Sequence, residues 1–231
     1  KMKIAFIIPS TSNGREWTDF NETYLNRIIG KTIPQTYNIK LFVGYNEDDK
    51  LYKEKSQRVD NIENILIEWI SFNSDYKGDP CAIWTILGQT AVEQHYDYLM
   101  VLGDDISMPT NENWLKCFLE KLIRNNNIGY SAGWSNNDEI PTQFLIHKTH
   151  LDIFGFIYPP QIKNWYCDNW MYNLYGDKFG NWLKDIHLLN VGGEPRYTPN
   201  NDKNISNILV KKHRKILFQY LNKNRCQNYI T

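Results

Sequence analysis

The chain has 231 residues, of which 42% are hydrophobic and 23% are charged. This composition excludes fibrous, low-complexity and disordered classes and allows one domain with a sizeable core. The 26 basic and 26 acidic residues cancel, so no global field directs the protein to nucleic acid or to an anionic membrane. We therefore expect a globular protein with no nucleic-acid partner.

Strands and helices are predicted to alternate along the chain. Apolar, β-branched runs predict strands at 4–8, 39–45, 65–70, 98–102, 128–132, 144–146 and 185–189, and helical periodicity predicts helices at 20–29, 80–92, 114–122, 149–154, 168–175 and 205–220. This alternation predicts an α/β fold: a mixed, mostly parallel sheet flanked by helices, with a C-terminal helix. No internal repeat divides the sequence, so we expect a single domain over 1–231. A polar stretch, 192–204, is expected to form a mobile loop before the last helix.

The cysteines and the first apolar run bear on location. Cys81, Cys117, Cys167 and Cys226 lie far apart and form neither a Cys-x-x-Cys pair nor a zinc pattern, which favours a reducing, cytoplasmic compartment. The apolar run 4–8 ends at Pro9, long before a membrane span is complete. We therefore expect no membrane span.

Two acidic groups follow predicted strands. Asp104 and Asp105 come directly after the most apolar strand, where Gly103 allows the backbone to turn. Adjacent carboxylates repel each other unless a cation or hydrogen-bond donors lie between them, so the pair indicates either a divalent metal site or an Asp-rich turn. The second group, 47–49, is more typical of a solvated loop than of a ligand site.

Two common nucleotide motifs are absent from the sequence. No Gly-x-Gly-x-x-Gly follows the first strand, and no Gly-x-x-x-x-Gly-Lys-Ser/Thr occurs anywhere. A bound nucleotide would therefore use a metal ion for its phosphates.

The order of these segments resembles a known family. Ile8-Pro9-Ser10-Thr11, then 43–49, then 99–106 are similar to the nucleotide-sugar half of a GT-A fold glycosyltransferase, closest to the small enzymes of large DNA viruses. The segment 155–170 is similar to the acceptor-side segment of inverting members. The resemblance implies a nucleotide-sugar half at about 1–105, an acceptor half at about 106–190, and a loop with the C-terminal helix at 191–231.

The resemblance also implies roles on the donor side. Pro9, Ser10 and Thr11 would line the base and ribose, and Asp48 or Asp49 would meet the base. Asp104 and Asp105 would hold the ribose and a Mn²⁺ or Mg²⁺ ion, with Asp105 assigned to the metal. His187 is a candidate further metal ligand by analogy, or else an ordinary histidine in a strand.

On the acceptor side, Asp168 is the candidate catalytic base of an inverting transfer, or else the N-cap of the following helix. Nearby aromatic side chains are candidates to stack on sugar rings: Trp134, Tyr158, Trp165, Tyr166 and Trp170. The resulting hypothesis is a metal-dependent transfer of a sugar from a UDP- or GDP-linked donor to a hydroxyl of a glycan or glycoconjugate. A nucleotidyltransferase of similar fold and a non-catalytic carbohydrate-binding module are the alternatives.

Overall fold

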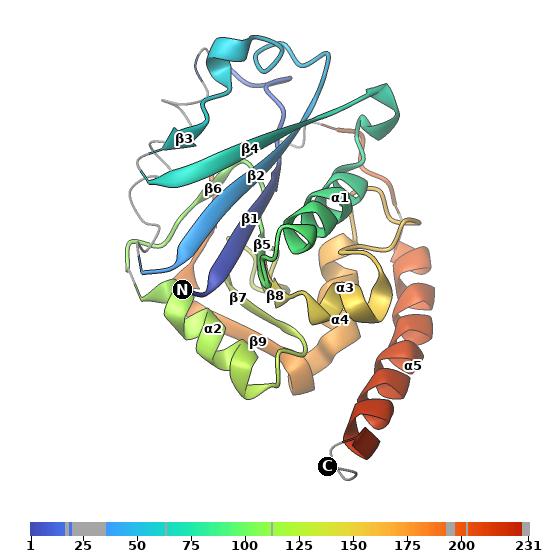
Figure 1. The fold of residues 1–231 in the computed structure, drawn as a ribbon. Coiled ribbons are helices and arrows are strands. Elements are labelled where there is room, and N and C mark those ends of the chain that lie inside the picture. The colour runs from blue at the N-terminus through green and yellow to red at the C-terminus, as the bar shows by residue number, and fades with distance from the viewer. Residues whose placement is uncertain are drawn as a thin grey trace.

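The computed structural model describes residues 1–16, 19, 36–62, 64–111, 113–192, 197–201 and 203–227. The helix predicted at 20–29 lies outside these residues. In chain order the elements are β1 (Lys3–Pro9), β2 (Asn38–Asn46), η2 (Lys55–Gln57), β3 (Asn61–Ile62), β4 (Ile65–Phe72), η3 (Ser74–Tyr76), α1 (Pro80–Glu93), β5 (Tyr98–Val101), β6 (Ile106–Ser107), α2 (Trp114–Arg124), β7 (Tyr130–Trp134), β8 (Phe144–His147), α3 (Thr149–Phe154), α4 (Cys167–Phe179), β9 (Gly180–His187), β10 (Leu189–Asn190) and α5 (Lys203–Gln227). Figure 1 shows their arrangement.

One twisted sheet forms the centre of the described structure. Its eight strands follow the order β3-β4-β2-β1-β5-β8-β7-β9. β1, β2, β4, β5, β7 and β9 run in one direction, whereas β3 and β8 run in the other. This arrangement confirms the predicted mixed, mostly parallel sheet, and it brings the carboxyl ends of six strands to one edge.

Helices cover both faces of the sheet (Figure 1). Along β1, Ile4, Phe6 and Ile8 belong to the core cluster beneath α2, and Ala5 and Ile7 belong to the cluster beneath α1, α4 and α5. The run Ile4 to Ile8 is fully buried. A strand that is buried on both faces needs apolar side chains at every position, which explains why the sequence is continuously apolar there.

The chain changes direction across the sheet at β1. β2 pairs with one edge of β1 and β5 pairs with the other, both in parallel. Ligands of open α/β sheets bind at such a switch point, outside the carboxyl ends of the strands. The segments that follow β1 and β5 are therefore the first place to examine for a site.

The second half of the chain differs in detail from the sequence-based prediction. The strand predicted at 185–189 is replaced by two strands: β9, which begins at Gly180 and ends at His187, and the short β10, Leu189–Asn190. The predicted loop 192–204 ends earlier, because α5 begins at Lys203. No helix of the described residues is long and apolar enough to cross a membrane.

Candidate active site

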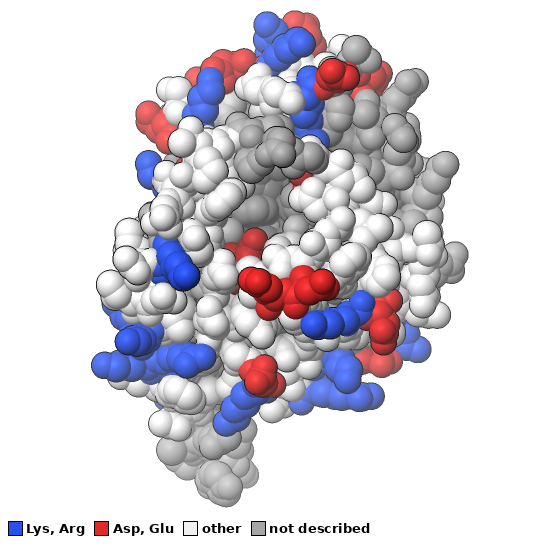
Figure 2. All heavy atoms as spheres, turned by 180° about the vertical axis from the view of Figure 1, so that it is seen from behind, with Lys and Arg blue, Asp and Glu red and all other residues white. Residues whose placement is uncertain are grey.

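A cavity of about 650 Å³ lies at the carboxyl ends of β1 and β5. This volume is typical of a small-molecule site. Its lining includes Pro9, Ser10, Thr11, Asn13, Asn46, Tyr76, Lys77, Gly78, Asp79, Trp84, Gly103, Asp104, Asp105, Asn136, Gln143, Asp168, Asn190 and Tyr197. Figure 2 shows a hollow on one face of the molecule, with acidic side chains at its lower edge. The predicted residues Pro9, Ser10, Thr11, Asp104, Asp105 and Asp168 all line the cavity.

Asp104 fastens the loop after β1 to the loop after β5. Its carboxylate accepts hydrogen bonds from the Ser10 hydroxyl at 2.9 Å and the Thr11 backbone N–H at 3.0 Å. The Arg15 guanidinium forms an ion pair with the same carboxylate, and both side chains are buried. Asp104 is therefore neutralised within the protein, and it fixes the shape of the cavity floor.

Asp105 is more exposed than Asp104. Its Oδ2 is 3.9 Å from Arg15 Nη2, and its backbone carbonyl accepts a hydrogen bond from the N–H of Val191 at 2.8 Å. A Cβ at Gly192 would lie only 2.0 Å from Asp105 Oδ2, so position 192 has no room for a side chain. The close approach of the chain at 191–192 holds Asp105 in place.

Amide side chains form a polar wall that the sequence analysis missed. β6 pairs with β10 in antiparallel register, which places Asn190 beside the loop that carries Asp105. Asn136 Oδ1 accepts from the Asn190 N–H at 3.0 Å, and Gln143 Oε1 accepts from the Gly103 N–H at 2.9 Å. Two-residue strands carry no periodic signal in the sequence, and pairing across more than 80 positions is not a local property.

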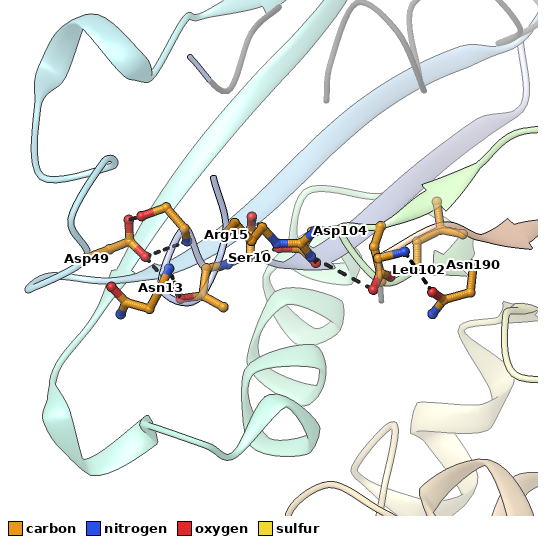
Figure 3. Close-up of polar contacts among 12 residues, drawn as sticks. Ser10, Asn13, Arg15, Asp49, Leu102, Asp104 and Asn190 are labelled. Atoms are coloured by element: carbon orange, nitrogen blue, oxygen red, sulfur yellow. Dashed lines mark hydrogen bonds and ion pairs between the residues drawn. The ribbon is translucent and has the colours of Figure 1, made fainter. Parts of the chain in front are cut away.

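Asp49 stabilises the loop after β1 through hydrogen bonds, so its acidic side chain is explained without a bound ligand. It is fully buried, and its carboxylate accepts from Thr11 Oγ1, Ser12 N and Ser12 Oγ at 2.5 to 3.1 Å and from the backbone N–H groups of Leu51 and Tyr52 at 3.0 Å. Figure 3 shows Asp49 and Asp104 on opposite sides of the segment that carries Ser10, Asn13 and Arg15. The two carboxylates thus hold the β1 loop between them.

Asp48 and His187 lie outside the residues that line the cavity. Asp48 is exposed and pairs with Lys77 at 3.1 Å. His187 is exposed at the end of β9, and its ring lies 5.1 Å from that of Trp134. The structure therefore brings neither residue to Asp104 and Asp105, although β9 does run toward the same sheet edge.

Asp168 lies in the first turn of α4 and lines the cavity. Tyr158 donates a hydrogen bond to its Oδ1 at 3.4 Å, and the Cys167 thiol lies 3.8 Å from the same oxygen. Burial raises the pKa of Asp168 from 3.8 to about 7, and the bonds from Cys167 and Tyr158 partly oppose this rise. A carboxyl group with a pKa near neutrality is suited to take up a proton.

The alternative interpretation of Asp168 as the N-cap of its helix is wrong. The N-cap of α4 is Tyr166, in the left-handed conformation at φ 71°. Asp168 is the second residue of the helix, and its carboxylate contacts the buried side chains of Tyr158 and Cys167.

The N-terminus of α1 also lines the cavity, but its N–H groups are already bonded. Asp79 is the N-cap and accepts from the Ala82 N–H at 3.0 Å, and the Cys81 N–H donates to the Lys163 carbonyl at 3.2 Å. A capped helix start with Pro80 in its first turn accounts for this segment.

The aromatic residues of the cavity are Tyr76, Trp84 and Tyr197. Of the five aromatic residues predicted to stack on sugars, Tyr158 and Trp170 are buried in the core, and the others do not line the cavity. Trp84 Nε1 donates to the Leu102 carbonyl at 3.0 Å, which fixes the indole at the cavity wall. Trp84 lies on α1 next to the buried core residue Ile83, so helical periodicity alone does not distinguish it from a core residue.

Asp105 is the residue of this site that could hold a divalent cation. Among the described residues no group of three or more His, Cys, Asp and Glu side chains could hold a metal ion. Asp104 accepts from Ser10 and Thr11 and pairs closely with Arg15, whereas Asp105 Oδ2 lies 3.9 Å from Arg15, so Asp105 is the member of this pair that could bind one. Mg²⁺ is commonly bound by one or two carboxylates, with phosphate oxygens and water as its other ligands. The donor set therefore suits a metal that arrives with a phosphate.

No family model and no curated protein matches this sequence. Among solved structures, the chain is similar to the crystal structure of S. aureus TarS 1–349, with 13% sequence identity and a TM-score of 0.50 over 81% of this chain. The chain spans 59% of the length of that TarS chain. At this identity the similarity shows the fold alone. TarS is GT-A-like, so this chain has a glycosyltransferase-like fold.

Proposed function

We propose that this protein is a metal-dependent glycosyltransferase that moves a sugar from a nucleoside-diphosphate donor to a hydroxyl of a glycan or glycoconjugate, with inversion. One observation carries the proposal: Asp105 and Asp168 line the same cavity, at the switch point of a glycosyltransferase-like fold. TarS is itself a glycosyltransferase, which supports the reaction class by analogy of fold.

The charge of the cavity supports a metal-bound donor. Asp79, Asp104, Asp105 and Asp168 line it, and Lys77 is the one Lys or Arg among its described lining residues. Lys77 is exposed and already paired with Asp48. Asp104 is neutralised by Arg15, but a diphosphate would be repelled by the other carboxylates unless a cation lay between them. Asp105 would hold Mn²⁺ or Mg²⁺, and the ion would neutralise charge on the leaving diphosphate.

The protein's own groups then divide the remaining work. Pro9, Ser10 and Thr11, in the loop fixed by Asp104, line the region proposed for the nucleoside. The oxygen of the acceptor hydroxyl bonds to the anomeric carbon of the donor sugar while the bond from that carbon to the diphosphate breaks. Asp168 takes the proton that the hydroxyl loses. Tyr158 holds Asp168 Oδ1, which leaves the other carboxylate oxygen for that proton.

The alternative of a nucleotidyltransferase is disfavoured by Arg15. Such an enzyme needs a basic loop that faces the phosphates, but the Arg15 guanidinium is buried against Asp104 and is not among the residues that line the cavity. A carbohydrate-binding module would not require a carboxyl group of raised pKa beside a second acidic residue in one cavity.

A panel of UDP- and GDP-sugars tests the proposal. In Mn²⁺, the cognate donor should raise the melting temperature by mass action and release nucleoside diphosphate when acceptor is present. Asp105→Ala should lose metal-dependent donor binding. Asp168→Asn should retain donor affinity and lose about 10² to 10⁴ in the rate of transfer.

The exposed Asp152→Asn, on α3, is the matched control for both variants. Donor binding by Asp105→Ala with unchanged metal dependence would remove the metal site from the proposal. Near-normal transfer by Asp168→Asn, or a product with retained anomeric configuration, would remove Asp168 as the base.

A further inference from the structure

The neutral chain hides a strong segregation of charge. α5 (Lys203–Gln227) contains seven basic residues and no acidic residue. The other 206 residues therefore carry 19 basic and 26 acidic residues, because the whole chain has 26 of each. In Figure 2, basic side chains gather at the lower left, on the side of the molecule where Figure 1 places α5. The net charge of zero gave no reason to expect attraction to a membrane. Net charge alone does not reveal this asymmetry between α5 and the rest of the chain.

α5 is amphipathic in an unusual way. Its inner face packs on α3 and α4 through Leu209, Val210 and Leu217, which are buried. The outward stripe consists of Ile208, Lys211, Lys215 and Phe218, whose spacing of three and four residues places them on one face. Ile208 is 66% exposed and Phe218 is 52% exposed, so two large apolar side chains flank two lysines on the outer surface.

The fold itself explains only some of these basic residues. Arg214 Nη2 donates to the Asn173 carbonyl of α4 at 2.6 Å, and residues in the last turn are favoured by the helix dipole. Lys211, Lys212 and Lys215 lie in the middle of the helix, and no ion pair involves them within the part of the chain that the structure describes. Like charges at i, i+3 and i, i+4 destabilise a helix, so this arrangement costs stability in the isolated protein.

We propose that the outward stripe of α5 binds the surface of an anionic phospholipid membrane. Lysines interleaved with exposed Ile and Phe match the charged headgroups and the acyl boundary that a helix lying in the membrane interface contacts. The helix lies on the bilayer and does not cross it, in agreement with its many charges. A purely electrostatic partner, such as a soluble polyanion, would not require Ile208 and Phe218 to be exposed.

The inner face of α5, not the outward stripe, contacts the segment that leads to the candidate active site. At the start of α5, the Ser206 hydroxyl donates to the carbonyl of Tyr166 at 3.3 Å. Tyr166 directly precedes α4, which carries Asp168 into the cavity. The first turns of α5 therefore contact the segment that leads to the cavity.

Vesicle co-sedimentation tests the proposal with the full chain. The protein should sediment with phosphatidylcholine vesicles that contain phosphatidylglycerol and stay in solution with phosphatidylcholine alone, and the binding should weaken as salt is raised. Lys211→Gln with Lys215→Gln should lower the partition coefficient roughly thirtyfold, from the usual contribution of a basic residue near an anionic surface. Ile208→Ser with Phe218→Ser should lower it as well.

The matched control is Lys116→Gln with Lys121→Gln on α2, which removes the same charge from exposed helical positions and should leave binding unchanged. Circular dichroism and the melting temperature check that each variant is folded. Equal loss in the α2 control, or equal binding to neutral vesicles, would overturn the proposal. Unchanged vesicle binding by the Ile208→Ser, Phe218→Ser variant, together with competition by soluble polyphosphate, would assign the stripe to a soluble polyanion instead. None of these vesicle-binding results tests the proposed sugar transfer, which is measured separately with donor and acceptor.

Discussion

The phenol of Tyr158 donates a hydrogen bond of 3.4 Å to Asp168 Oδ1 from a ring that is almost fully buried. This bond favours the ionised carboxylate and so opposes the effect of burial on the pKa of Asp168. Tyr158→Phe should therefore raise that pKa above about 7. A lost bond of about 1 kcal/mol corresponds to a roughly fivefold smaller ionisation constant, and so to roughly threefold less ionised carboxylate at pH 7. The pH profile of transfer should move to higher pH, with full activity recovered in alkali.

Tyr175→Phe provides the control for this experiment. It also removes a buried phenol, one that bonds to His150 at 2.7 Å and does not line the cavity. An identical pH profile for wild type and Tyr158→Phe would mean that the bond does not act on Asp168.

Asp168 should reduce the stability of the folded protein at high pH. Its folded pKa, about 7, lies above the ordinary value of 3.8, so the folded state binds this proton more tightly than the unfolded state. The contribution of Asp168 to the free energy of unfolding is thus fully present below pH 3.8 and is lost as pH rises through 7. Asp168→Asn should be more stable than wild type by about 1 to 3 kcal/mol at pH 8, with a smaller difference at pH 4. Urea unfolding at the two pH values measures this, and a pH-independent difference would contradict it.

His150 should act in the opposite direction over nearly the same range of pH. Nε2 of this buried ring lies 3.0 Å from the Ile157 carbonyl, so it donates there, and Nδ1 accepts from the Tyr175 hydroxyl. Burial lowers the pKa of His150 from 6.5 to about 4. Since the unfolded state then binds the proton more tightly, this contribution to stability is lost as pH falls from 6.5 toward 4.

In the wild type, the effects of Asp168 and His150 on the pH dependence of stability therefore oppose each other. Between pH 4.5 and 6.5 the free energy of unfolding should rise with pH more steeply in Asp168→Asn than in the wild type, by about 2 kcal/mol over this range. Urea unfolding across this range checks the slope. A flat profile in the variant would show that His150 does not resist protonation.

Asp49 and Asp48 should behave differently despite being neighbours. Asp49→Asn removes acceptor capacity from a buried group that holds the β1 loop and should cost about 2 to 4 kcal/mol of stability. Asp48 is exposed and forms a surface pair with Lys77, so Asp48→Asn should change stability by less than about 0.5 kcal/mol. Thermal unfolding of both variants tests this, and equal losses would mean that the loop does not depend on Asp49.

Much of the fold could be predicted from the sequence because its central strands are buried on both faces. The continuous apolar runs at 4–8 and 98–102 predict β1 and β5. Asp104 and Asp105 follow the second run, at the sheet edge where parallel strands end. Patterns of this kind depend only on neighbours along the chain.

Other features depend on contacts that only the folded chain makes. A buried structural carboxylate such as Asp49 and a ligand-binding one look alike in sequence. The amide wall around Asn190 depends on the pairing of β6 with β10, and Trp84 reaches the cavity from a helix whose other apolar residues are core. The pKa of Asp168 depends on its burial with Tyr158 and Cys167, which come together only through tertiary packing.

The central position of β1 has a consequence for biosynthesis. Ile4 pairs with Tyr98, 94 positions later, so one edge of this strand, whose residues 4–8 are all apolar, has no partner until β5 has left the ribosome. At typical translation rates that interval is about 5 to 20 seconds, long enough for an exposed strand edge to meet another nascent chain. Contacts of such long range also slow folding after release. Soluble yield during recombinant expression should thus depend on cooling and on chaperones more than on the final stability of the native state.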